Sequence, residues 1–236
     1  MLISHRKRFI FTKTIKTAGT TVESYFEQYC MPDGDWKSSH LREEYVSETG
    51  VIGYRGGDSS GCTWYNHMAA KKIRDLIGEN IWNEYFRFTV IRNPFDKLIS
   101  AFYMYEKRKQ HGRLSKESLI NRARCENEIE RFRRWVKSGG KVIDRQIYMI
   151  DGEVCVDYFI PFEDLAEGIK CICNRLTIPF EPSRIQRLKA GARPGSVPIC
   201  EYYDSETEQI VREIYAWEIS KFGYDLPAES MSQPVI

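Results

Sequence analysis

The 236-residue sequence contains no hydrophobic run close to the 18 residues that a membrane-spanning helix needs. Its basic N-terminus is not followed by an apolar segment of signal-peptide length or by a small-residue cleavage site. Neither sign of charge is in excess, because 35 Lys and Arg residues stand against 33 Asp and Glu residues. The sequence therefore indicates neither a membrane nor a nucleic-acid partner, and it predicts a cytoplasmic protein.

Paired cysteines and histidine clusters are also missing. The seven cysteines, at positions 30, 62, 125, 155, 171, 173 and 200, are odd in number and include no Cys-x-x-Cys pair. With only four histidines, the chain lacks the ligand spacing of a zinc site. We expect reduced thiols and no bound metal.

What the sequence does contain is typical of a globular domain, with 42% hydrophobic and 29% charged residues. It has no internal repeat, and no linker rich in Pro, Ser or Gly occurs before residue 227. We expect one domain over residues 1–226 and a flexible C-terminal tail over 227–236.

Hydrophobic periodicity predicts strands that alternate with helices. The predicted strands are 9–12, 51–54, 86–91 and 154–160. The predicted helical segments are 22–29, 69–77, 95–102, 115–137, 162–176 and 210–222. This alternation favours an α/β fold with a central parallel sheet and helices on both faces. Residues 30–66 are too long for an ordinary connection and are a candidate functional loop.

The turn after the first predicted strand is rich in small and hydroxylated residues, with the sequence Lys16-Thr17-Ala18-Gly19-Thr20-Thr21. Small residues let backbone amides close around an anion at a helix N-terminus, Lys16 adds a positive charge, and the threonine hydroxyls add donors. A helix N-cap beside an exposed lysine is the alternative interpretation. The turn does not have the Gly-x-x-x-x-Gly-Lys-[Ser/Thr] pattern of nucleotide triphosphatases.

A second motif, Val90-Ile-Arg92-Asn-Pro-Phe-Asp-Lys-Leu-Ile-Ser100-Ala-Phe-Tyr103, joins a strand to a helix. Asn93 suits the N-cap and Pro94 the first helical position. Arg92 can bind a phosphate bidentately beside that helix N-terminus, and Ser100 lies about two turns into the helix. The alternative is an Arg92 paired with a carboxylate and an uninvolved Ser100.

Together the two motifs resemble those of the sulfotransferase family, and the resemblance extends to residues 159–165 and 202–204. It is closest to the carbohydrate-type and bacterial branch. It implies a P-loop NTPase-like sulfotransferase fold and an enzyme that transfers a sulfuryl group from 3′-phosphoadenosine-5′-phosphosulfate (PAPS) to an acceptor hydroxyl, or to an amine. The acceptor would be a small-molecule metabolite or a glycan, and a hydroxylated secondary metabolite is favoured.

The resemblance also implies roles for individual residues. Residues 16–21 would hold the 5′-phosphosulfate, and Arg92 with Ser100 would hold the 3′-phosphate. Lys189 and Arg193 would add contacts to the nucleotide, although their loop departs from the family's spacing and can equally be a solvated loop.

Sulfuryl transfer also needs a base for the acceptor proton. His67, just before the predicted helix 69–77, is the first candidate because histidine titrates near neutral pH. Asp58 and Glu43 are alternative bases, and a simple helix cap is the alternative role for His67. Lys16 and His67 are thus the predicted catalytic residues.

Two other functions are consistent with the sequence. One is a small-molecule kinase, which would need Mg²⁺, and the other is a module that binds an adenosine bisphosphate without turnover. The kinase is disfavoured because the strand 86–91 ends on Arg92, where such enzymes usually have a Mg²⁺-binding Asp. The oligomeric state is open.

Overall fold

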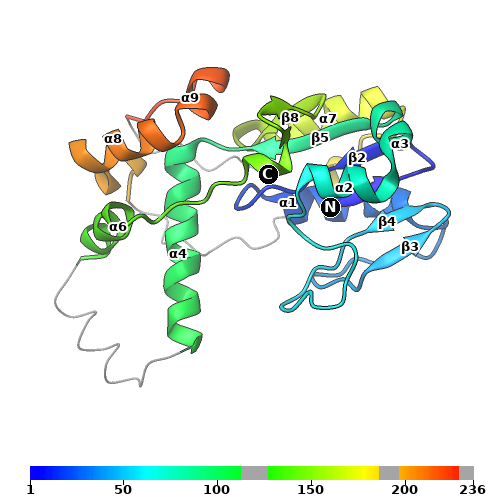
Figure 1. Cartoon of the computed structure of the whole chain (residues 1–236), viewed down its shortest axis with the longest axis horizontal. Helices are drawn as coiled ribbons and strands as arrows, with labels where there is room; N and C mark the ends of the chain where they lie inside the picture. Colours follow the sequence, from blue (N-terminus) through cyan, green and yellow to red (C-terminus); the bar gives the residue numbers. More distant parts are fainter. Residues whose placement is uncertain (113–126, 186–196, 229–236) are drawn as a thin grey trace. The chain divides into compact units, whose positions relative to one another are not determined.

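The computed structural model describes residues 1–112, 127–185 and 197–228 (Figure 1). These residues form two compact units that are interleaved along the chain. Of the described residues, 1–91 and 144–185 make up the first unit, and 92–112, 127–143 and 197–228 make up the second.

The first unit is built on a six-stranded sheet with the strand order β3-β4-β1-β2-β5-β8. Its strands are β1 Leu2–Ser4, β2 Phe9–Phe11, β3 Tyr45–Ser47, β4 Gly50–Ile52, β5 Phe86–Ile91 and β8 Tyr158–Pro161. Two further strands, β6 Met149–Ile150 and β7 Glu153–Val154, pair with each other as a separate antiparallel hairpin.

The sequence predicted a parallel sheet, and only half of its strands pair in parallel. β5 pairs in parallel with β2 and with β8, whereas β1, β3 and β4 join the sheet by antiparallel pairing. The reason is local, because β1 and β2 are separated by only residues 5–8 and so short a connection permits antiparallel pairing alone. Arg8, at φ 52°, completes that turn without a glycine.

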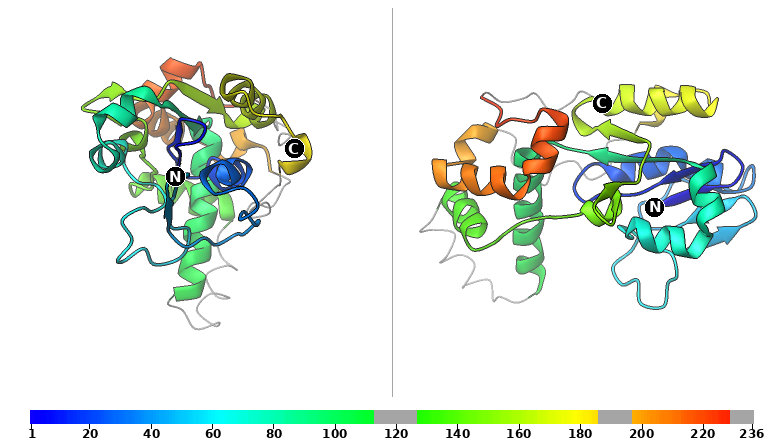
Figure 2. Two further views of the ribbon diagram at one scale, coloured as in Figure 1. Left: turned by 90° about the vertical axis from the view of Figure 1, so that its right-hand side faces the viewer. Right: turned by 45° about the horizontal axis from the view of Figure 1, so that its top comes forward.

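The helices of the first unit cover both faces of the sheet, as predicted. They are α1 Gly19–Phe26, α2 Ala70–Ile77, α3 Glu79–Glu84 and α7 Leu165–Leu176, with short 3₁₀ turns η1 Glu27–Cys30, η2 Arg145–Ile147, η3 Phe162–Asp164 and η4 Pro182–Arg184. The left view of Figure 2 shows α2 and α3, in teal, on one side of the dark blue N-terminal strands and α7, in olive, on the other.

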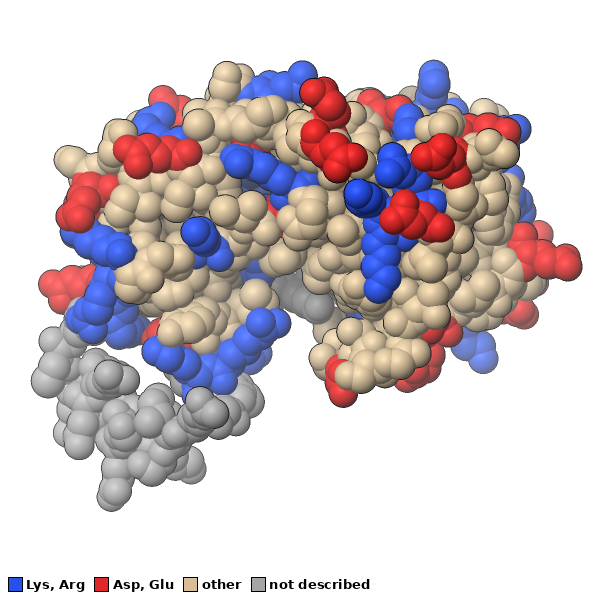
Figure 3. Space-filling model, viewed as in Figure 1, with Lys and Arg blue, Asp and Glu red and all other residues tan. Residues whose placement is uncertain are grey.

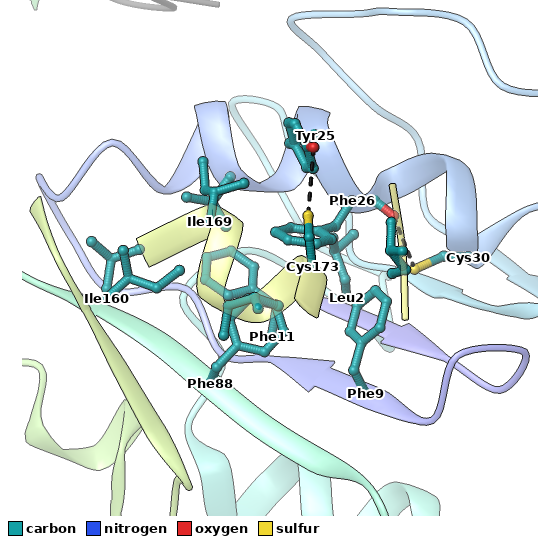
Figure 4. Close-up of a cluster of buried hydrophobic side chains, with 14 of the residues drawn as sticks. Leu2, Phe9, Phe11, Tyr25, Phe26, Cys30, Phe88, Ile160, Ile169 and Cys173 are labelled. Carbon is teal, nitrogen blue, oxygen red and sulfur yellow. Dashed lines mark hydrogen bonds between the residues drawn. The ribbon is translucent and has the colours of Figure 1, made fainter. Parts of the chain in front are cut away.

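Residues that alternate along a strand point to opposite faces of the sheet, and each face has its own hydrophobic core. Phe9, Phe11 and Phe88 face α1 and α7, and all three side chains are fully buried (Figure 4). Ile3 and Ile10 point to the opposite face, where they pack with residues of α2 and α3. This alternation is the period of two that a buried strand requires.

The second unit is helical. Its helices are α4 Pro94–Gly112, α6 Glu128–Lys137, η5 Ile199–Tyr202, α8 Ser205–Ile214 and α9 Ala216–Phe222. Their common core contains Phe95, Phe102, Phe132, Tyr202 and Val211.

Several predicted elements have different bounds in the structure. The helix expected over 210–222 is two helices that meet at Tyr215, whose hydroxyl bonds the backbone of Val142. The strand expected over 154–160 is split between β7 and β8. Of the charged segment 115–137, α6 is helical and residues 113–126 lie outside the described part, as do residues 229–236 of the expected tail. Acidic and basic side chains are interspersed on the face drawn in Figure 3.

Candidate functional site

The loop between β2 and α1 contains the predicted anion-binding segment, residues 16–21. Its backbone adopts the left-handed conformation at Lys16 (φ 63°) and at Ala18 (φ 57°), which residues with a side chain adopt rarely. Ala18 is the N-cap of α1, no side chain caps the helix, and no acidic residue occupies its first turn. The first amides of α1, at the positive end of the helix dipole, are therefore suited to an anion.

Two tethers fix this loop within the first unit. The Thr14 hydroxyl donates to the Val90 carbonyl at 2.5 Å and lies 2.7 Å from the Thr17 hydroxyl. The Ile15 amide donates to the buried Asp144 carboxylate at 2.7 Å. Because Thr14 gives its proton to Val90, Thr17 is the donor between the two hydroxyls. The Thr17 hydroxyl thus helps to stabilise the loop, and its predicted contact with an anion stays a prediction.

His67 contacts the start of the same loop. Its imidazole Nδ1 lies 3.0 Å from the carbonyl oxygen of Lys13. A carbonyl only accepts hydrogen bonds, so Nδ1 carries the proton and Nε2 is the acceptor of the neutral ring. Burial, followed by the positive charge of Lys13, lowers the pKa of His67 to about 4. The expectation of titration near neutral pH is therefore wrong, and the ring is a neutral base throughout the physiological range.

His67 does not cap the helix that follows it. The N-cap of α2 is Ala69, and no side chain bonds the first amides of that helix. The alternative role as a helix cap is therefore wrong. His67 instead has a left-handed backbone with φ 59°, a conformation that costs a residue with a side chain about 1–3 kcal/mol and persists only where surrounding contacts impose it.

The alternative base Asp58 is already engaged in a turn. Its Oδ1 accepts hydrogen bonds from the Ser60 hydroxyl at 2.6 Å and from the Ser60 amide at 2.9 Å. These two bonds lower the pKa of Asp58 and make it a weaker base. Glu43, the other alternative, is exposed on the segment before β3.

A network of buried charges adjoins the loop, and the sequence analysis missed it. Glu23 of α1 forms ion pairs with Lys13, with Arg55 at 2.9 Å and with the amino group of Met1 at 2.5 Å. Arg55 also pairs with Glu27. Burial alone would raise the pKa of Glu23, but Lys13, the Met1 amine and Arg55 together hold it well below its usual range.

One sequence signal pointed to this network. Glu23 and Glu27 are four residues apart, so they share a face of a segment whose other face is apolar, and neither has a basic residue three or four positions away to neutralise it. Two carboxylates in such a segment need cationic partners from elsewhere in the chain once they are buried, as Glu23 and Glu27 are here.

The second motif begins the second unit. Asn93 accepts a hydrogen bond from the Phe95 amide at 3.0 Å, and α4 begins at Pro94, as predicted. Arg92 donates from Nε at 2.8 Å and from Nη2 at 2.6 Å to a single carboxylate oxygen of Asp96. The structure therefore contains the Arg92–carboxylate pair that the sequence offered as an alternative to phosphate binding.

The remaining predicted site residues have different places in the structure. Ser100 is half-buried on α4 and belongs with Arg92 to the second unit, whereas residues 16–21 and His67 belong to the first. Lys189 and Arg193 lie outside the described residues. In the described part of the chain, no group of three or more His, Cys, Asp or Glu side chains is placed to hold a metal ion. None of the helices in residues 1–112, 127–185 and 197–228 is both long and apolar enough for a membrane span.

The fold and these residues define an α/β protein with an anion-binding type of loop after β2 and an arginine directly after β5. The model of the Sulfotransferase family matches residues 1–225, and the chain belongs to this family. The predicted family is thus confirmed, and the mixed sheet flanked by helices is compatible with its fold. No curated protein and no solved structure matches the chain.

Proposed function

We propose that the protein transfers the sulfuryl group of PAPS to an acceptor hydroxyl, with His67 as the general base. One observation carries this proposal: the Lys13 carbonyl binds His67 Nδ1 at 3.0 Å, which leaves Nε2 as the basic atom next to the loop that follows β2. Membership of the Sulfotransferase family supports sulfuryl transfer in general. PAPS as the donor, and the acceptor, belong to the proposal.

The residues of the first loop fit the 5′-phosphosulfate of PAPS. The uncapped first turn of α1 contains no acidic residue that would repel it, and Lys16 supplies a positive charge. We assign this group to Lys16, to the amides of Thr17, Ala18, Gly19 and Thr20, and to the hydroxyls of Thr20 and Thr21. We assign the 3′-phosphate to Arg92 and Ser100, with Lys189 and Arg193 as further contacts.

PAPS, when bound, supplies the sulfuryl group. His67 Nε2 takes the acceptor's hydroxyl proton while the acceptor oxygen bonds to sulfur and the bond from sulfur to the 5′-phosphate oxygen breaks. The Lys16 ammonium stabilises the negative charge that develops on that phosphate oxygen. The products are a sulfate ester and adenosine 3′,5′-bisphosphate, and the imidazolium then returns its proton to solvent.

The acceptor that we propose is a hydroxylated small molecule such as a secondary metabolite, with a glycan as the second choice. A cytoplasmic location remains a prediction. Transfer of ³⁵S from labelled PAPS to a mixed set of hydroxylated metabolites and oligosaccharides tests both the donor and the acceptor. Absence of labelled product with every acceptor class, in a protein that binds adenosine 3′,5′-bisphosphate, would favour the non-catalytic binding module.

The variant His67→Asn tests the base. We expect the melting temperature and the PAPS affinity of the wild type to be retained, while kcat falls by about 10² to 10⁴, the usual cost of removing a general base. His5→Asn is the matched control, because that ring bonds the Tyr85 hydroxyl instead of the loop. Near-normal turnover in His67→Asn would mean that another residue is the general base.

The pH profile gives an independent test of the same residue. Protonation of Nε2 removes the base, so the wild-type rate should fall as the pH drops through about 4, the pKa of His67. This acidic limb should be absent from the residual activity of His67→Asn. A limb near pH 6.5 in the wild type would contradict the neutral, buried ring.

A further inference from the structure

Lys13 contacts the Asn66–His67 pair through two different groups. Its carbonyl oxygen accepts from His67 Nδ1 at 3.0 Å, and its ammonium donates to Asn66 Oδ1 at 3.3 Å. The side chain is only 4% exposed, and its charge is paired with the fully buried Glu23. Lys13 thus binds the segment at two adjacent residues, Asn66 and His67. The ion pair with Glu23 holds the Lys13 side chain in place.

The backbone of His67 shows why these two hydrogen bonds are needed. At φ 59° the residue occupies a conformation that an unconstrained histidine avoids. The bond from Nδ1 to the Lys13 carbonyl holds the ring, and the bond from the Lys13 ammonium to Asn66 Oδ1 holds the preceding side chain. Together they fix the place and the tautomer of the imidazole.

The cations near His67 act on its pKa in the same direction as its burial, whereas the hydrogen bond to the Lys13 carbonyl acts against it. The Lys13 ammonium and the Met1 amine disfavour an imidazolium, and Glu23 opposes them. Because Glu23 is itself neutralised by Lys13, Arg55 and the Met1 amine, the positive field prevails. Removal of the Lys13 charge alone should therefore make His67 easier to protonate.

We propose that Lys13 is the positioning residue of His67: its carbonyl holds the ring in the Nδ1–H tautomer and its ammonium keeps the ring neutral, so that the lone pair of Nε2 is free in the resting protein. The use made of Nε2 rests on the proposed function, whereas the coupling of Lys13 to His67 does not. The loop thus contains two lysines with separate tasks. Lys13 acts on the base, and Lys16 acts on the leaving group.

Histidine NMR of the full-length protein tests this proposal without any turnover. The imidazole ¹⁵N signals of His67, identified by their loss in His67→Asn, should show the Nδ1–H tautomer in the wild type. In Lys13→Met we expect the midpoint of the His67 titration to rise by about one pH unit or more, the size of effect that a nearby like charge exerts. Lys16→Met is the matched control, since it removes a lysine of the same loop and should leave the midpoint unchanged.

A second variant guards against a folding defect in Lys13→Met. Asn66 is half-buried, so Asn66→Asp should fold, and its new carboxylate next to Lys13 should also raise the His67 midpoint. The tautomer should stay the same in both variants, because the Lys13 carbonyl belongs to the backbone. An unchanged midpoint in folded Lys13→Met, or in Asn66→Asp if Lys13→Met does not fold, would overturn the proposal, and so would an Nε2–H tautomer in the wild type.

Kinetics separates this proposal from the proposed function. If His67 is the base, the acidic limb of the rate profile should move upward in Lys13→Met, whereas Lys16→Met should lower kcat without moving the limb. If the NMR midpoint moves but His67→Asn turns over normally, the role of Lys13 stands and the assignment of the base fails.

Discussion

Charged residues in or next to the two candidate motifs are held in different ways. In the first unit, Lys13, Glu23 and Arg55 form a network whose side chains are at most 4% exposed. In the second unit, Arg92 lies two residues before the start of α4 and pairs with Asp96 in the first turn of that helix, and these side chains are 12% and 17% exposed. The first arrangement involves residues far apart in sequence, and the second involves neighbours.

The comparison shows two ways to keep a cation in place. When one member of a buried ion network is removed, its partners remain as buried charges without a counter-charge, which is strongly destabilising. A partly exposed ion pair between neighbours in sequence contributes about 1 kcal/mol or less and can exchange its partner at little cost. The first unit therefore holds Lys13, and with it His67, firmly in place. The weaker pair of Arg92 is compatible with the phosphate contact that we propose for it.

The largest effect is expected for Glu23→Gln. Lys13 and the Met1 amine would lose their buried counter-charge, and we expect a loss of about 3–5 kcal/mol in the free energy of unfolding. Urea denaturation at pH 7 measures it. A loss below about 1 kcal/mol would mean that the network does not stabilise the first unit.

The effect of Glu23→Gln on the free energy of unfolding should also depend on pH. Since the pKa of Glu23 is lowered on folding, its contribution is complete above its ordinary value of 4.5 and is lost as the pH falls below it. The difference in stability between the wild type and Glu23→Gln should therefore narrow in acid.

The next effect concerns Lys16, the cation that we assign to the leaving group. Lys16→Ala should lower kcat by about 10² to 10³, the usual loss for one preorganised electrostatic contact, with little change in the KM for PAPS. Steady-state kinetics with labelled PAPS measures both constants. A rise in KM alone would make Lys16 an anchor of the bound state.

Arg92→Ala should produce a smaller effect, confined to nucleotide binding. Adenosine 3′,5′-bisphosphate should raise the melting temperature of the wild type much more than adenosine 5′-monophosphate does. The variant should lose most of this difference, with a cost of about 2–3 kcal/mol in affinity for a charge-assisted contact. Equal affinities for the two nucleotides in the wild type would mean that Arg92 does not bind the 3′-phosphate.

The smallest effect is expected for Asp96→Asn, the same carboxylate-to-amide change as Glu23→Gln. Because its ion pair spans a single turn and is partly exposed, we expect the free energy of unfolding to fall by less than about 1 kcal/mol. Urea denaturation of the two variants side by side gives the comparison. Similar losses in both would show that the two motifs are held equally firmly.

Local signals in the sequence predicted the parts of the fold that depend on neighbours. The strand over 86–91 and the helix start at Asn93 and Pro94 are in the structure as predicted, because a buried strand and a capped helix need only adjacent residues. The strand β1 was missed, since its three residues resemble any short apolar run and its turn has Arg8 where a glycine would have signalled a hairpin.

The site was predictable to a lesser extent. Residues 16–21 and His67 were predicted from their types and order, but the sequence did not show that His67 meets Lys13 at the start of the same loop. His67 and Lys13 are 54 positions apart, and Arg55 lies 32 positions from Glu23. Contacts at such separation depend on the path of the whole chain, so neither the tautomer of His67 nor its low pKa had a local sequence signal.

The tether between Ile15 and Asp144 has a consequence for how the protein is made. The two residues are 129 positions apart, so a chain growing on the ribosome completes its first strand and helix long before the aspartate is available. Contacts of such long sequence separation form slowly, because the intervening chain must be ordered first. We therefore expect the site to mature late in synthesis, and truncation before residue 144 to yield a chain with β2 and α1 but without a finished loop between them.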